Sequence, residues 1–119
     1  MESAPHSVLV AEDEGIVGLM LEEMLRDFGA GVVDVFAHAA QAVEAANARQ
    51  YDLAILDVAL LDGSAPVAGV LEARGVPFMF SSAMGPDAVE ARHRSRVLLS
   101  KPFGEEELRE HVLGLLASA

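Results

Sequence analysis

Side chains that could do acid–base or phosphoryl chemistry follow four short apolar segments of the chain. They are Glu12, Asp13, Asp57, Ser82 and Lys101. If the apolar segments are parallel strands, their carboxyl ends share one edge of a sheet, where open α/β folds bind their ligands. The sequence therefore predicts that three carboxylates, one hydroxyl and one ammonium group converge at that edge.

The three carboxylates point to a metal ion. Two carboxylates about 5 Å apart repel each other by roughly 3 kcal/mol at an effective dielectric constant near 20. A hard divalent cation removes this repulsion, and Mg²⁺ binds one or two carboxylates together with water and phosphate oxygens. We therefore expect Glu12, Asp13 and Asp57 to hold Mg²⁺, with the backbone carbonyl of Ala59 as a further ligand.

Phosphoryl transfer onto a carboxylate is the reaction that this set supports. Asp57 would act as the nucleophile and form an acyl phosphate, while Mg²⁺ neutralises the oxygens of the transferred group. Lys101 would hold a second phosphoryl oxygen, and Ser82 would donate a hydrogen bond to a third. A purely structural interpretation stays open for each group: Asp57 could open a turn, the acidic pair could cap a helix, the lysine could be solvated, and the serine could belong to a turn.

Five apolar segments alternate with helical patterns along the chain. The expected strands are residues 7–11, 32–36, 53–57, 76–80 and 97–99, and the expected helices are residues 16–28, 39–48, a short one around 67–71, a weak one at 86–93, and 105–116. Such alternation is typical of a parallel sheet between two layers of helices. We expect one doubly wound α/β domain over residues 1–119, with strand order 2-1-3-4-5 and residues 1–6 as a frayed leader.

The apolar positions of the first helix predict which side faces the sheet. One stripe with helical spacing consists of Val17, Met20, Leu21, Met24 and Phe28. Gly29 is expected to end this helix, and Gly75 to end the third, because glycine is the usual C-terminal cap.

The composition limits the classes of function. The chain has 119 residues, no cysteine and a formal net charge of −11, which excludes disulfides and thiolate sites and argues against a nucleic-acid partner. No apolar run is long enough to span a membrane, and the N-terminus does not have the pattern of a signal peptide. A soluble cytoplasmic protein is the expectation.

The ordered motifs resemble the receiver domain of bacterial two-component response regulators over essentially the whole chain. The matching residues are Glu12-Asp13, Asp57, Ser82-Ala83 and Lys101-Pro102-Phe103. The resemblance implies a flavodoxin-like (βα)5 fold, phosphorylation of Asp57 by a sensor histidine kinase with Mg²⁺ as cofactor, and a cis peptide bond before Pro102. It also implies a signalling protein and not an enzyme, apart from catalysis of its own phosphoryl transfer and dephosphorylation.

Expected partners follow from the same resemblance. Because the chain ends at Ala119 without a DNA-binding or enzymatic domain, we expect output through contacts with an unidentified protein or transfer of the phosphoryl group to a phosphotransferase.

Ile16 and Leu19 lie outside the main stripe of the first helix and are either scattered surface residues or a docking patch for the kinase's helical bundle. A homodimer through the fourth and fifth helices is a further option. The basic cluster at residues 92–96 is either a partner contact or solvated.

Two features depart from the usual receiver pattern. Leu98 stands three residues before Lys101, where receivers usually carry a Tyr or Phe that rotates during switching. Residues 76–85 are similar to the Pro-Phe-x-Phe-Ala-Thr-Gly-Tyr segment of an atypical alphaproteobacterial class of stand-alone receivers, with Ser81 and Ser82 in place of Ala-Thr. That class often lacks the aromatic residue too, so the way in which this chain would switch stays open.

Three other functions share parts of this pattern. A flavin-binding flavodoxin needs a hydroxyl- and glycine-rich loop after the first strand, and residues 12–14 are acidic instead. A phosphatase of the haloacid dehalogenase type needs a second Asp two residues after its nucleophile, where this chain has Ala59. A pseudo-receiver, which binds partners without being phosphorylated, stays open, although the intact Asp57 and Lys101 count against it.

Overall fold

A five-stranded parallel sheet forms the centre of the protein. The computed structural model describes residues 7–27, 29–60, 63–83, 96 and 98–118. Its strands are β1 (Ser7–Ala11), β2 (Val32–Phe36), β3 (Leu53–Asp57), β4 (Phe78–Ser82) and β5 (Leu98–Ser100), in the order β2-β1-β3-β4-β5. All four strand pairs are parallel. The predicted flavodoxin-like fold and its strand order are therefore confirmed.

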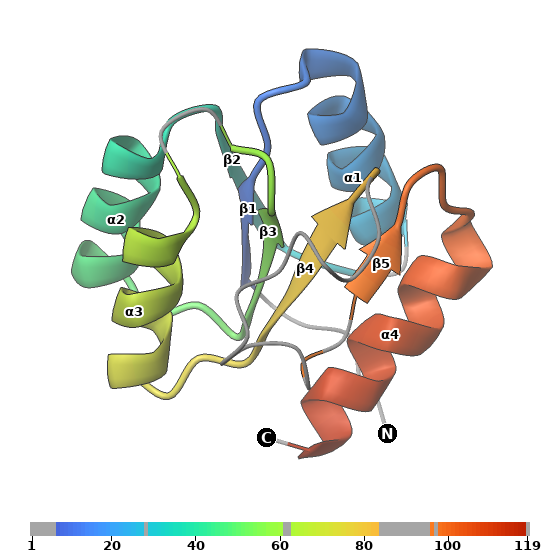
Figure 1. The fold of residues 1–119 in the computed structure, drawn as a ribbon. Coiled ribbons are helices and arrows are strands. Elements are labelled where there is room, and N and C mark those ends of the chain that lie inside the picture. The colour runs from blue at the N-terminus through green and yellow to red at the C-terminus, as the bar shows by residue number, and fades with distance from the viewer. Residues whose placement is uncertain (1–6, 28, 61–62, 84–95, 97, 119) are drawn as a thin grey trace.

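Helices cover both faces of the sheet. In the described part of the chain, α1 (Gly15–Asp27) and α4 (Glu105–Ser118) lie on one face, and α2 (Ala39–Ala48) and α3 (Ala65–Ala73) lie on the other (Figure 1). The helix predicted at residues 86–93 falls outside the described residues, and with it the dimer contact expected from the fourth helix. None of the described helices combines the length and the apolar composition needed to cross a membrane.

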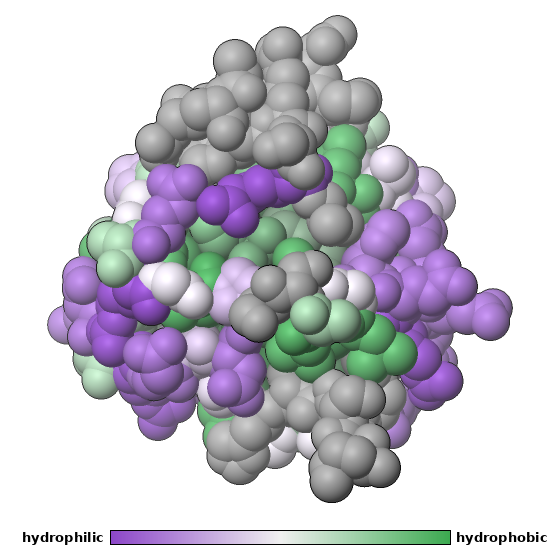
Figure 2. Space-filling view, turned by 90° about the horizontal axis from the view of Figure 1, so that it is seen from below, coloured by the Kyte–Doolittle hydropathy of each residue, from purple (hydrophilic) through white to green (hydrophobic). Residues whose placement is uncertain are grey.

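The sheet carries a separate apolar core on each face. Every residue of β3 is buried, as expected for a parallel strand that is covered on both sides. Because successive side chains alternate, Leu56 belongs to the cluster beneath α2 and α3, whereas Ile55 belongs to the cluster beneath α1 and α4. On the surface seen from below, hydrophobic residues are visible near the middle and hydrophilic residues at the left and right (Figure 2). The end of β3 is therefore held in place from both faces.

The buried face of α1 differs from the predicted stripe. Met20 is 40% exposed, whereas Leu25, which the stripe left out, is fully buried together with Leu21 and Gly18. A Cβ at Gly18 would lie 3.1 Å from Val35 Cγ1, so the absence of a side chain lets the helix approach β2. The prediction for Met20 was wrong, because apolar periodicity does not identify a glycine as a point of contact.

Two helices end as predicted. Gly29 and Gly75 follow α1 and α3 with φ angles of 113° and 70°, a region that glycine adopts without steric cost. Phe28 and Val97, which were predicted to belong to the first helix and the fifth strand, lie outside the described residues.

β4 is shifted toward its carboxyl end relative to the prediction. It begins at Phe78 and not at Val76, because Pro77 has no N–H to donate to a neighbouring strand, and it continues through Ser81 and Ser82. The two serines are therefore part of the sheet, so the turn interpretation of Ser82 was wrong.

Arg96 is the one described residue of the basic cluster at 92–96. Its guanidinium lies 3.9 Å from the centre of the Phe78 ring and 3.1 Å from a carboxylate oxygen of Glu72. A cation over an aromatic ring is attracted to it. Arg96 therefore holds β4 and α3 together through contacts within the chain.

Candidate functional site

Asp57 ends the central strand β3, and its side chain is buried. The backbone N–H of Ala59 donates a hydrogen bond of 2.9 Å to Asp57 Oδ1, and the backbone N–H of Val58 donates one of 2.9 Å to the carbonyl of Ser81. These bonds fix the turn after the strand and orient the carboxylate. Asp57 Oδ2 consequently faces Lys101, at 3.3 Å from Nζ.

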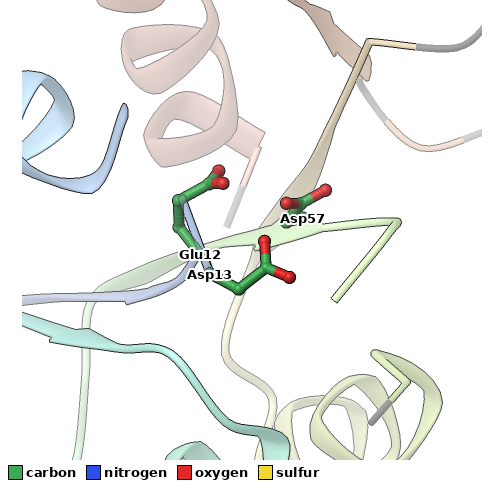
Figure 3. A group of neighbouring side chains, drawn as sticks. All are labelled: Glu12, Asp13 and Asp57. Carbon is green, nitrogen blue, oxygen red and sulfur yellow. The ribbon is translucent and has the colours of Figure 1, made fainter. Parts of the chain in front are cut away.

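Glu12 and Asp13 follow β1, the strand that pairs directly with β3. The backbone N–H of Glu12 donates a hydrogen bond of 2.9 Å to the carbonyl of Phe36, and the Glu12 side chain is buried. One carboxylate oxygen from each of Glu12, Asp13 and Asp57 lies within 4.8 Å of the others. Figure 3 shows the three carboxyl groups turned toward a common space. The structure thus brings the three predicted metal-binding side chains together.

Lys101 supplies positive charge to this space from the end of β5. Its side chain is largely buried, and its Nζ contacts oxygens of Glu14 at 3.0 Å, of Glu12 at 3.1 Å and of Asp57 at 3.3 Å. The lysine is therefore bound by carboxylates and is not solvated.

The turn after β5 positions this lysine. The backbone N–H of Lys101 donates a hydrogen bond of 2.9 Å to the carbonyl of Ser82, which ties the residue to β4. The peptide bond between Lys101 and Pro102 is cis, as the resemblance implied. Phe103 then packs against the apolar cluster beneath α1 and α4. These backbone and packing contacts hold the Lys101 main chain at the rim of the acidic site.

Burial and crowding set the protonation of the site. The pKa of Glu12 is raised to about 7, first by burial and then by the neighbouring Asp57, against the opposing effect of Lys101. Burial lowers the pKa of Lys101, but hydrogen bonds to Glu14 and Glu12 outweigh this effect and raise it above its ordinary value. At neutral pH Lys101 is therefore charged, and the Glu12 carboxyl group of the metal-free protein holds a proton more readily than an exposed glutamate does.

The oxygen atoms of this site fit a hard divalent cation. Glu12 Oε1 lies 3.1 Å from Lys101 Nζ but has no well-aligned hydrogen bond from any residue that the structure describes. Glu12 and Asp57 are buried and Asp13 adds a third carboxyl group, so one ammonium group does not neutralise the set when all three are ionised. Carboxylate oxygens are ligands that Mg²⁺ prefers. The donor set therefore suits Mg²⁺, and the Ala59 carbonyl remains a predicted ligand.

Two serines at the end of β4 lie near the charged groups. Ser82 is buried and pairs in register with Ser100, and its contact with a phosphoryl oxygen stays a prediction. Ser81 pairs in register with Asp57, and its buried Oγ has no hydrogen-bond partner among the described residues. Sequence reasoning noted Ser81 only as a departure from the Ala-Thr of the similar segment and gave it no role, because its neighbour Asp57 is known only from the register of β3 and β4. It also gave no role to Glu14, although a third acidic residue directly after the acidic pair was a usable signal.

An apolar groove borders the acidic site. It has a volume of about 310 Å³, and its lining consists of Val17, Met20, Ala83, Pro102 and Phe103 together with Glu14 and Lys101. Ile16 is 76% exposed on the same helix, and Leu19 is exposed as well. Exposed apolar side chains that gather in this way are typical of a surface that binds another protein.

Comparisons with known proteins agree with this geometry. The family model described as response regulator receiver domain matches residues 8–113. The transcriptional regulatory protein PdtaR of Mycobacterium tuberculosis is 32% identical over 111 residues, which cover 89% of this chain and 54% of that protein. The chain thus spans about half the length of this curated relative.

Solved structures show the same arrangement of strands and helices. SdrG from Sphingomonas melonis Fr1 is 35% identical, with a TM-score of 0.85 and coverage of 96% of this chain and 98% of that chain. The receiver domain of PhyR from Erythrobacter litoralis is 28% identical, with a TM-score of 0.81 and coverage of 94% and 90%.

Proposed function

Because this chain belongs to the response regulator receiver domain family, we propose that it is a cytoplasmic phosphoacceptor that takes a phosphoryl group from a sensor histidine kinase on Asp57. Receiver domains are signalling modules, and we propose that this one acts through contacts with an output protein or a phosphotransferase. The observation that carries the proposal is the approach of three carboxylates to within 4.8 Å of one another, beside a largely buried ammonium group.

Asp57 is the proposed nucleophile. One of its oxygens forms a bond to phosphorus while the bond from phosphorus to the donor's histidine nitrogen breaks, and that nitrogen keeps the electron pair. The hydrogen bond from the Ala59 N–H orients the carboxylate for this step. Lys101 would exchange a carboxylate contact for a phosphoryl oxygen, and its raised pKa keeps it charged for that contact. Ser82 would donate a hydrogen bond to another phosphoryl oxygen.

Mg²⁺ is the proposed cofactor, held by Glu12, Asp13 and Asp57 with the carbonyl of Ala59 as a further ligand. When bound, it supplies positive charge that neutralises the oxygens of the transferred group. Glu12 can bind a metal only as a carboxylate, so its raised pKa means that metal binding releases a proton near neutral pH.

The proposed docking surface for the kinase is the apolar face at the start of α1. Ile16 and Leu19 are exposed there, and Met20 lines the groove that leads to Lys101. Apolar side chains on one helix bind a partner helix by packing into its grooves. A kinase helix on this face would bring its histidine close to the acidic site.

The substitution Asp57→Asn tests the proposed function. After incubation with acetyl phosphate and Mg²⁺, we expect the natural sequence to acquire an acid-labile phosphoryl group and the variant to acquire none. Asp27→Asn is a matched control, because Asp27 is exposed at the end of α1 and its loss removes the same charge. Label that survives in the Asp57 variant would reassign the nucleophile, and an unlabelled natural sequence would overturn the proposal.

Partner binding without phosphorylation is a second candidate function. The exposed apolar side chains of α1 favour it, because they can pack against a partner helix whatever the state of Asp57. The helical bundle of a cognate kinase, titrated with and without beryllofluoride, separates the two candidates. Equal affinity in both conditions, and in the Asp57→Asn variant, would favour this second function.

A further inference from the structure

The ammonium group of Lys101 is shared among three carboxylates. Its nitrogen carries three N–H donors, and the oxygens that it contacts are Glu14 Oε1 at 3.0 Å, Glu12 Oε2 at 3.1 Å and Asp57 Oδ2 at 3.3 Å. All three donors are therefore in use in the unphosphorylated protein. A phosphoryl oxygen can bind to Lys101 only if one of these contacts is given up.

The three carboxylates differ in how strongly each is destabilised when its contact with Lys101 is broken. The side chains of Glu12 and Asp57 are 0% and 4% exposed, and a buried carboxylate that loses its cation is strongly destabilised. The side chain of Glu14 is 62% exposed, so water can replace the lysine there. Exposed ion pairs contribute little to stability. Glu14 is therefore the partner that leaves most easily.

Glu14 also stands apart from the proposed metal ligands. Among the described residues, the group of carboxylates within 4.8 Å of one another consists of Glu12, Asp13 and Asp57 and does not include it. The backbone carbonyl of Glu14 accepts a hydrogen bond of 2.9 Å from the N–H of Gly18 at the start of α1, a bond that any residue at position 14 can accept. Its side chain is therefore available to act on Lys101 without a second task.

We propose that Glu14 is a positioning residue that holds Lys101 in the unphosphorylated protein and releases it when a phosphoryl oxygen arrives. This inference rests on the proposed phosphoryl transfer to Asp57. The Glu14 carboxylate competes with the phosphoryl group for one N–H donor of the lysine, and its negative charge repels an anionic donor. Because Glu14 also lines the apolar groove beside α1, a protein bound in that groove reaches this contact directly.

The substitution Glu14→Gln removes the charge and keeps the size of the side chain. Glu23→Gln is the matched control, because Glu23 is exposed on the same helix and the net charge changes equally. With saturating Mg²⁺, we expect the Glu14 variant to bind beryllofluoride, an analogue of the phosphoryl group, about fivefold more tightly than the natural sequence, measured by amide NMR titration. Affinity for Mg²⁺ alone should change by less than about twofold, and the control should match the natural sequence. Unchanged beryllofluoride affinity in the Glu14 variant, or an equal gain in the control, would overturn the inference.

A second readout separates this inference from the proposed function. If neither protein binds beryllofluoride or accepts phosphate, the proposed function fails, and exchange of the Lys101 ammonium protons with water still tests the contact. In the metal-free protein, we expect faster exchange in the Glu14→Gln variant than in the natural sequence and the Glu23→Gln control, because one hydrogen-bond acceptor is weakened. Equal exchange in all three proteins would show that Glu14 does not hold the lysine.

Discussion

Glu12 and Lys101 are 89 residues apart in the chain, yet their charged atoms lie 3.1 Å from each other. The contact joins the end of β1 to the end of β5 across β3 and β4, which lie between them in the sheet. It forms because parallel strands place their carboxyl ends at one edge. Removal of Lys101 leaves the buried carboxyl groups of Glu12 and Asp57 without their cation, so the contact affects stability as well as chemistry.

The raised pKa of Glu12 makes the stability of the metal-free protein depend on pH. The pKa is about 7 in the folded protein and near 4.5 in the unfolded chain, so the folded state keeps a proton that the unfolded state has lost. The retained proton adds up to about 3 kcal/mol to the free energy of unfolding. This stabilisation is fully present below the pKa of the unfolded chain and is lost as pH rises through the pKa of the folded protein. In EDTA we expect the free energy of unfolding by urea to fall between about pH 5 and about pH 8, and Glu12→Gln to lack this part of the slope. An identical slope in the variant would show that Glu12 does not cause this dependence of stability on pH.

Loss of the Lys101 ammonium group should lower the free energy of unfolding more in the metal-free protein than in the Mg²⁺-bound protein. Lys101→Ala leaves the carboxylates of Glu12 and Asp57 buried together, and we expect a loss of about 2 kcal/mol in EDTA. Because a bound cation would neutralise the same carboxylates, Mg²⁺ should restore most of this loss of stability. Urea denaturation with and without Mg²⁺ measures the loss in both conditions, with Arg109→Ala on the exposed side of α4 as the control. Equal destabilisation in the two conditions would count against this arrangement of charges.

Replacement of Ser81 by alanine should stabilise the protein. Its Oγ is buried without a hydrogen-bond partner among the described residues, and burial of an unsatisfied polar group costs about 1–3 kcal/mol. Alanine removes the hydroxyl and leaves a gap of a single atom, so we expect a net gain of about 1 kcal/mol in the free energy of unfolding. Ser100→Ala, at an exposed position of β5, should change it by less than about 0.5 kcal/mol. A loss of stability in the Ser81 variant would mean that the hydroxyl is hydrogen-bonded after all, for example to a buried water molecule.

The ends of β1, β2 and β3 could be predicted from local sequence, whereas β4 runs two residues further than predicted. The meeting of the charged groups could be predicted because parallel strands place their carboxyl ends at one edge of the sheet. A continuous apolar run at residues 53–56 followed by Asp57 marks a buried parallel strand, and alternation with helices then places the other strand ends beside it. The rotation of α1 could not be predicted in this way, since it depends on the close approach of Gly18 to Val35 on another element.

The surroundings of three further residues also depend on contacts between distant segments. Glu14 gains its partner Lys101 from the turn after β5, and Ser81 acquires its neighbour Asp57 through the register of β3 and β4. Leu98, at the position of the usual aromatic residue, packs against the apolar cluster beneath α2 and α3. Spacing along the chain reveals none of these contacts, because each requires the arrangement of the whole sheet.

β5 has three residues, and Lys101 follows it in the turn that leads into α4. The C-terminal helix is thus tethered to the acidic pocket by one short connection, which is pinned to the adjacent strand at the Ser82 carbonyl. We therefore expect a partner that displaces α4, which also packs on the sheet through Leu108 and Val112, to displace the main chain of Lys101 as well.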